Sequence, residues 1–145
     1  MDKRLDIPME RQIEAFRRSV MESEHEGRFL TVHCVRALDE ILRIHKEMRP
    51  SQPWMIHGFR GKPQQLRSIL SEGFYVSFGL HFNEESLRAC PLSRLCIETD
   101  DTPAPILPLY ETIAHIRDME LDELKKAMLH NGSVLVRKSL LDGIV

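Results

Sequence analysis

The sequence predicts an α/β protein built on a parallel sheet, and three observations support this prediction. Four short apolar runs have the composition of buried strands, and they are 29–33, 54–57, 74–78 and 95–99. Amphipathic segments with helical spacing lie between these runs, as crossover helices do between parallel strands. The runs recur at intervals of about 20 to 25 residues, which is long enough for such crossovers.

The size and composition are those of one globular domain. With 145 residues, the chain is expected to form a single domain over 1–145. Hydrophobic residues make up 42% and charged residues 29%, which is ordinary for a protein that folds in water. The net charge of −2 provides no general attraction to nucleic acid or to anionic membranes, so a phosphate-binding role needs a local basic patch.

The cysteines and the apolar runs indicate the cellular compartment in which the protein is expected. Three cysteines without CxxC spacing argue against a disulfide framework or a zinc ribbon, and reduced thiols favour a cytoplasmic protein. The first six residues are charged and precede no apolar core, so we expect no signal peptide. No apolar run approaches the ~20 residues of a membrane span, so we expect no membrane partner.

Helices are predicted before and between the strands. The first covers about 8–26, where apolar side chains recur on one face at Met9, Ile13, Phe16 and Val20. The second covers about 37–48 and the third about 63–70, with Gly73 following as a C-cap glycine would.

Shorter helical segments follow in the second half. We predict helices over about 83–89, 109–117 and 122–130, the last ending near Asn131 and Gly132, with no regular structure over 101–105. The pattern amounts to four βα units, which is either half of an eight-stranded (β/α) barrel or a small open sheet.

Residues of metal-ligand type stand at the ends of three predicted strands. His33 and His57 are the last residues of their runs, and Asp100 directly follows the fourth run. Parallel α/β folds place their sites at the carboxyl ends of strands. Neutral imidazoles and a carboxylate suit Zn²⁺, Mn²⁺ or Fe²⁺, and a carboxylate beside the ion can take the proton of an attacking water. We therefore predict a hydrolytic metal site of His33, His57 and Asp100, the alternative being hydrogen-bonded structural residues.

Basic residues follow the two histidines. Arg60 and Lys62 lie in a glycine-containing loop after His57, just before a predicted helix N-terminus, and Arg36 follows His33 by three positions. Such loops favour anions, and a guanidinium binds phosphate with two parallel hydrogen bonds. We predict that Arg60, Lys62 and Arg36 bind substrate phosphate. The alternatives are a solvated basic turn and, for Arg36, an ion pair with Glu98.

Four motifs together resemble one family. The segments 32–37, 56–61, 73–79 and 91–100 occur in the order, and at about the spacing, of TatD-like metal-dependent hydrolases, and 122–131 is similar to that family's last helix. The resemblance covers about 12–136. It implies a (β/α)₈ barrel (the TIM barrel) of the amidohydrolase superfamily. It also implies a divalent-metal enzyme (Zn, Mn or Mg), commonly a deoxyribonuclease or another phosphoesterase nuclease.

The resemblance also assigns roles to individual residues. His33 resembles the ligand after the fifth barrel strand, His57 the ligand after the sixth, and Asp100 the aspartate after the eighth, which binds metal and handles the proton of water. Arg60 departs from the serine usual in that loop, which leaves the substrate class open.

Part of the family's site has no counterpart in this sequence. The family also uses an H-x-H pair after its first strand and a glutamate after its fourth, and the sequence contains no H-x-H. The chain therefore resembles barrel strands five to eight, the C-terminal half, as a truncated gene model, a fragment or a degenerate paralogue would. A half barrel leaves two sheet edges unpaired, so we expect self-association or a complementing N-terminal half.

Three functions remain open on the sequence. The first is a metal-dependent phosphoester hydrolase, a TatD-like deoxyribonuclease, with little activity in this chain alone. The second is a non-catalytic binding or assembly module that keeps half of the barrel. The third is an unrelated small doubly wound phosphate-binding domain, in which Arg60 and Lys62 would matter and the histidines would not.

Overall fold

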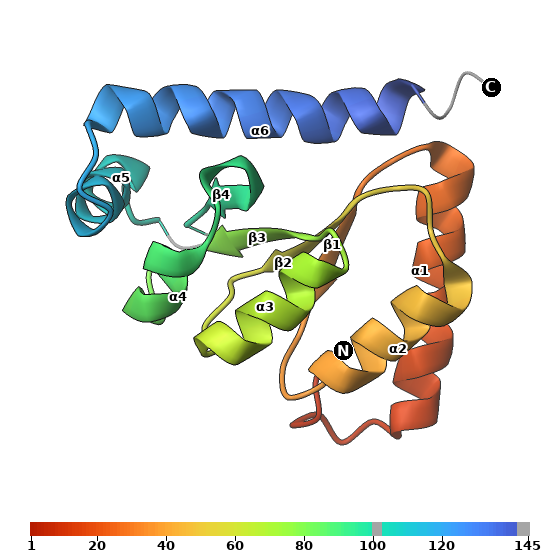
Figure 1. Ribbon diagram of the computed structural model, residues 1–145. Helices are drawn as coiled ribbons and strands as arrows, with labels where there is room; N and C mark the ends of the chain where they lie inside the picture. Colours follow the sequence, from red (N-terminus) through yellow and green to blue (C-terminus); the bar gives the residue numbers. More distant parts are fainter. Residues whose placement is uncertain (100–102, 142–145) are drawn as a thin grey trace.

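The computed structural model describes residues 1–99 and 103–141, and their side chains as far as Val136. Within these ranges four strands form one parallel sheet in the order β1-β2-β3-β4 (Figure 1). The strands are β1 (Leu30–His33), β2 (Trp54–His57), β3 (Tyr75–Phe78) and β4 (Leu95–Ile97). The prediction of four parallel strands with helices between them is confirmed.

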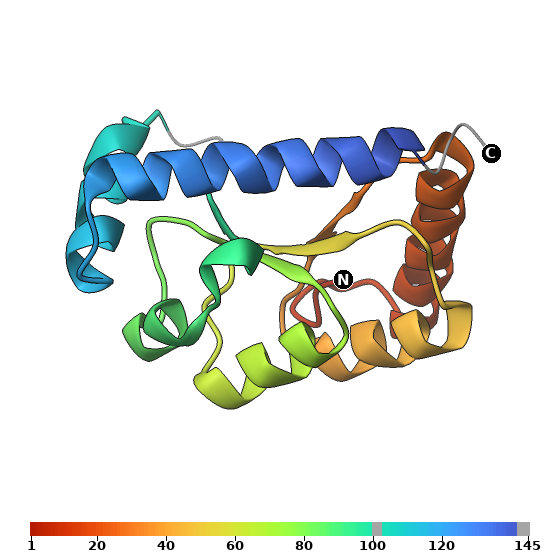
Figure 2. The same cartoon turned by 45° about the horizontal axis from the view of Figure 1, so that its top comes forward.

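The strand order distinguishes the two architectures that the sequence leaves open. A doubly wound sheet reverses its strand order at a switch point, whereas the described strands follow one another consecutively. Crossovers between parallel strands are right-handed, so a consecutive order places the crossover helices on one face of the sheet. Figures 1 and 2 show α2 (Leu38–Met48), α3 (Pro63–Ser71) and α4 (Glu84–Ala89) along the same side of the strands. This winding is that of a segment of a barrel.

Local signals in the sequence set the bounds of several helices. The first helix, α1 (Met9–Glu26), ends at Gly27, whose φ of 61° is left-handed and favours glycine. Pro63 opens α3, where a missing backbone N–H loses no hydrogen bond. The side chain of Asn83 caps α4 by accepting a 2.9 Å hydrogen bond from the Ser86 N–H.

The core lies between the strands and the crossover helices. Val32, Ile56 and Val76 occupy corresponding positions on β1, β2 and β3, and all three are buried. Ile41 and Ile44 of α2 and the apolar face of α3 belong to the same cluster of buried side chains. Burying one such side chain stabilises a fold by about 1.5–3 kcal/mol, so this cluster holds the strands in register.

The two last helices differ from their predicted bounds. Helix α5 (Ile106–Ile116) begins three residues before the predicted start, because Pro108 falls in its first turn, where proline is tolerated. Helix α6 (Leu121–Leu141) does not end near Asn131 but continues well past Gly132. It runs along the side of the sheet away from α2 and α3 (Figures 1 and 2). Among the helices of the described ranges, none is long and apolar enough to cross a membrane.

Tertiary contacts explain why α6 continues through its polar middle. The side chain of Asn131 is buried, and its Nδ2 donates hydrogen bonds of 2.7 Å to the carbonyl oxygens of both Leu92 and Leu95. These bonds join α6 to the short 3₁₀ turn η1 (Leu92–Arg94) and to the start of β4. An asparagine that looks like a helix end in the sequence is therefore an anchoring residue.

An aromatic cluster joins α1, α2 and β2. The ring of His45 packs edge-on against Trp54 and Phe74, with centroid distances of 4.8 and 4.6 Å, and Phe16 meets Trp54 at 5.3 Å. Burial lowers the pKa of His45, and the nearby Glu72 carboxylate opposes the shift. His45 is thus a partly buried residue that packs against the core aromatic side chains.

We expect Asn131→Leu to lower the free energy of unfolding by about 1–3 kcal/mol, because it removes the donor from the carbonyl oxygens of the buried Leu95 and the partly buried Leu92. Urea denaturation with an unchanged m-value measures this loss. The neighbouring His130→Leu, at an exposed position, is the matched control and should stay within about 0.5 kcal/mol of the native chain. Equal effects of the two substitutions would contradict the anchoring role.

We expect the chain to lose stability as the pH falls below 6.5, because His45 has a lower pKa in the folded than in the unfolded state. The unfolded chain then binds a proton that the folded chain resists, so the contribution is present above the unfolded pKa and is lost below it. Thermal unfolding of the native chain and of His45→Gln across this range measures the difference. A pH slope that His45→Gln leaves unaltered is the contrary result.

Candidate functional site at the ends of β1 and β2

The register of the sheet makes His33 and His57 neighbours. They are Cα partners at the last position of β1 and β2. Side chains of register partners in parallel strands leave the sheet on the same face. The structure therefore brings these two predicted site residues together at the carboxyl edge of the sheet, whereas Asp100 lies outside the described residues.

A cavity of about 690 Å³ opens beside the two histidines, within the size range of small-ligand sites. Both histidines line it, together with Arg36 and Arg60. Lys62 stands at the exposed position before α3 and is not among the lining residues of this cavity. Of the predicted phosphate-binding residues, Arg36 and Arg60 thus lie at the cavity, and Lys62 lies on the nearby surface.

His57 is held by a carboxylate from the far edge of the sheet. Its Nδ1 lies 2.8 Å from each carboxylate oxygen of Glu98 and makes its hydrogen bond to Oε2. The Glu98 main-chain N–H donates to the carbonyl oxygen of Phe78 at 3.1 Å, which places Glu98 directly beyond β4. The contact spans β3 and joins the ends of β2 and β4.

The chain turns sharply after His57. Gly58 has a φ of 59°, and its N–H donates to the Oγ of Ser77 at 3.1 Å. The N–H of Phe59 donates to the Ser77 carbonyl oxygen at 2.8 Å. A side chain at Gly58 would strain this turn, because left-handed backbone favours glycine. The turn directs the chain from β2 toward Arg60 and the start of α3.

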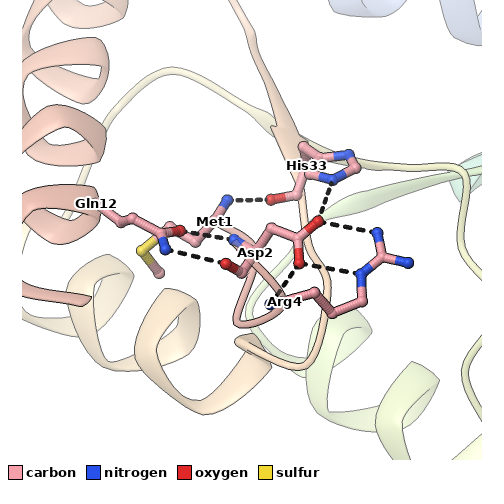
Figure 3. A network of polar contacts seen from close by, with 5 residues as sticks. All are labelled: Met1, Asp2, Arg4, Gln12 and His33. Atoms are coloured by element: carbon pink, nitrogen blue, oxygen red, sulfur yellow. Dashed lines mark hydrogen bonds and ion pairs between the residues drawn. The ribbon is translucent and has the colours of Figure 1, made fainter. Parts of the chain in front are cut away.

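His33 meets a carboxylate from the first residues of the chain (Figure 3). Its Nε2 lies 3.6 Å from Oδ2 of Asp2, whose side chain is 9% exposed. Arg4 binds both carboxylate oxygens of Asp2 through its side chain, at 3.2 and 2.9 Å, and donates its main-chain N–H at 2.8 Å. These contacts hold the pKa of the Asp2 carboxyl well below its usual range.

Main-chain contacts seat this first segment beside β1. Val35, just past the strand, donates to the Met1 carbonyl oxygen at 2.9 Å and accepts from the Lys3 N–H at 3.0 Å. Gln12 of α1 bonds both main-chain groups of Asp2, at 2.8 and 3.0 Å. Arg4 thereby becomes a third arginine at the cavity.

Arg36 adopts a left-handed backbone conformation, with φ of 53°. This conformation costs a non-glycine residue about 1–3 kcal/mol and often accompanies functional sites. Here it lies between β1 and α2 and leaves Arg36 exposed at the cavity.

Sequence reasoning did not place Glu98, Asp2 or Arg4 in the site, and it considered Glu98 as a partner of Arg36 instead. Glu98 is a carboxylate near the end of the fourth apolar run, and this place in the sequence is the signal that points to it. Asp2 and Arg4 carry no such signal, because their contacts with the ends of the strands depend on the path of α1.

The donor set is a pair of imidazoles in the described part of the chain. No group of three or more histidine, cysteine, aspartate or glutamate side chains that could hold a metal occurs among the described residues. His33 and His57 are of the ligand type that Zn²⁺ and Mn²⁺ accept, and a third ligand must come from elsewhere. The pair suits a divalent cation but does not by itself complete a site.

Comparison with known proteins places this geometry in a family. The model of the family described as TatD related DNase matches residues 1–137. Because this match begins at the first residue, it does not support assigning the chain to the C-terminal half of the family. No curated protein matches the sequence.

Two solved structures share the fold. The TatD homologue YjjV of Escherichia coli K12 superposes with a TM-score of 0.83 at 21% identity, over 93% of this chain and 60% of its own. A TatD family hydrolase of Entamoeba histolytica gives 0.75 at 16% identity, over 87% of this chain and 56% of its own. The chain thus spans less than two thirds of these relatives. By the match over residues 1–137, it belongs to the TatD related DNase family.

Proposed function

We propose that this chain is part of a divalent-metal-dependent hydrolase that cleaves phosphoester bonds, with DNA as the substrate class. The observation that carries the proposal is the pairing of His33 with His57 at one end of the sheet, beside a cavity that arginines line. Membership in the TatD related DNase family supports the same chemistry.

Each predicted site residue has a role in this proposal. His33, His57 and Asp100 hold the cation, which is Zn²⁺, Mn²⁺ or Mg²⁺. When bound, the cation supplies Lewis acidity to the phosphoryl group and to the attacking water. Asp100 is the general base that takes the proton of that water, as a carboxylate at a strand end can.

The arginines orient the substrate. Arg36 and Arg60 line the cavity, and each stands three residues after one of the two histidines; a guanidinium binds two phosphate oxygens at once. Lys62 adds positive charge at the exposed start of α3, where the helix N-terminus also favours anions. Arg4 has a different part, since its side chain is bound to Asp2.

We further propose that the four strands are the last four of a barrel and act with strands from elsewhere. The resemblance implies an H-x-H pair and a glutamate that this sequence does not match, and the solved relatives are longer than this chain. Within the described ranges, β1 and β4 each pair with a neighbouring strand on one side. The unpaired main-chain N–H and C=O groups at the open edges of a sheet can pair with further strands. A complementing N-terminal half or a second copy would provide them.

A second function has one observation in its favour. Both histidines already contact carboxylates of the chain, His57 at 2.8 Å and His33 at 3.6 Å. Such contacts give them a structural use without metal, as in a binding or assembly module that keeps the barrel winding. The two functions differ in whether metal uptake depends on His33.

We expect the purified chain to bind Mn²⁺ or Zn²⁺ weakly, because two imidazoles form an incomplete ligand set. We also expect His33→Ala and His57→Ala each to abolish this binding, because each removes one of the two imidazoles. Calorimetric titration measures this, with the exposed His130→Ala as the matched control. Binding that survives both substitutions would favour the assembly module.

The same samples should show little DNA cleavage. Strong Mn²⁺-stimulated cleavage that His57→Ala removes would disprove the need for further strands.

We expect the isolated chain to associate, because strands beside β1 and β4 would cover their open edges. Static light scattering over a range of concentrations measures the molar mass. A stable monomer at every concentration would contradict the proposal of a partner, and it would leave the metal titration to decide on the histidines.

A further inference from the structure

We infer that Glu98 is a positioning residue that holds His57 in a single tautomer and a single ring orientation at the cavity. The inference deepens the proposed function, since it concerns one of the same two histidines. It rests on the contact between His57 and Glu98, and its test has a readout that needs no metal.

The chemistry of the contact dictates the tautomer. A carboxylate is only an acceptor, so the ring nitrogen that it meets carries the hydrogen. Nδ1 of His57 lies 2.8 Å from Oε1 and from Oε2 of Glu98. This is the short distance of a charge-assisted hydrogen bond. In the neutral imidazole the hydrogen therefore resides on Nδ1 and the lone pair on Nε2, which is the atom with which a histidine held in this way accepts a proton or a cation.

The carboxylate is itself held in place. The Glu98 main chain is bonded to β3 through Phe78, and its side chain is 19% exposed. Oε1 is buried and accepts no hydrogen bond with good geometry in the described part of the chain. A Cβ at Gly58 would stand 3.7 Å from this oxygen, so the turn after β2 packs closely against it. The main-chain bond to Phe78 and the low exposure of the side chain both favour the orientation in which Glu98 meets the ring of His57.

The other histidine provides an internal contrast. His33 is 61% exposed, and its Nε2 lies 3.6 Å from Asp2, beyond hydrogen-bond distance. The Asp2 carboxylate is bound by Arg4 instead (Figure 3). Asp2 therefore does not dictate the tautomer of His33 as Glu98 dictates that of His57. Variants at Asp2 are the matched controls for variants at Glu98.

Holding the tautomer has a consequence for binding. A ring that samples both tautomers and two flipped orientations turns its unprotonated nitrogen toward a cation only part of the time. The apparent affinity for the cation is then reduced by the fraction of time spent in that state. Carboxylates that accept a hydrogen bond from a metal-binding histidine fix the orientation of its ring, and this raises metal affinity by about 10–100-fold. Glu98 is in the position to give His57 this advantage.

The tautomer is measured directly in the metal-free chain. Long-range ¹H–¹⁵N spectra of histidine-labelled protein in alkaline buffer show which ring nitrogen carries the hydrogen, and His57→Gln assigns the signals. We expect the native chain to hold His57 with the hydrogen on Nδ1. Glu98→Gln is nearly isosteric but offers both a donor and an acceptor, so it should give a mixture of tautomers. Asp2→Asn should leave the His57 signals unchanged.

Two spectral results would overturn the inference. One is a native His57 that already populates both tautomers or carries its hydrogen on Nε2; this result needs no variant and so does not depend on how Glu98→Gln folds. The other is a folded Glu98→Gln chain, checked by circular dichroism, whose His57 signals match those of the native chain.

Mn²⁺ titration separates this inference from the proposed function. We expect Glu98→Gln to weaken Mn²⁺ binding by about 10–100-fold and Asp2→Asn to weaken it less. Equal affinity in Glu98→Gln and the native chain would remove the positioning role while leaving the proposed function intact. If the native chain takes up no Mn²⁺, the proposed function fails, and the spectra alone decide whether Glu98 sets the tautomer.

Discussion

The site depends on the register between β1 and β2. His33 and His57 meet because Leu30 pairs with Trp54 and Val32 with Ile56 along the same two strands. Side chains alternate between the faces of a strand, so a slip of one residue would turn one histidine to the opposite face and expose a buried side chain. Val32, Trp54 and Ile56 are all at most 2% exposed, which strongly disfavours such a slip. The packing of the core thus determines the geometry of the site.

Carboxylates from distant segments of the chain contact the two histidines that the strand register brings side by side. Glu98 reaches His57 across β3, and Asp2 reaches His33 from a segment that α1 and the end of β1 hold in place. The two contacts differ in strength for a physical reason. Asp2 is neutralised by Arg4, whereas Glu98 lies against the ring of His57 and a glycine turn. The pair of histidines therefore has one firmly oriented member and one exposed member.

Sequence patterns are most reliable where a single element decides the outcome. The four strands and most helix bounds followed from apolar spacing, Pro63 and Gly73, because helix and strand periods are local properties. The end of α6 could not be predicted, since Asn131 looks like a terminating residue until its bonds to Leu92 and Leu95 are known. The start of α5 was missed for a related reason, because Pro108 is tolerated in a first turn that no local signal marked.

The sequence by itself determined that His33 and His57 end two short strands, and that an arginine follows each of them by three positions. Only the tertiary structure decided that these strands are neighbours and that Glu98 is the partner of His57. It also decided that Arg36 and Arg60 line the same cavity as the two histidines, whereas Lys62 does not line it. The physical reason is sequence separation. Residues 41 positions apart meet only through the order and register of the whole sheet, and the periodicity of one segment carries no information about either.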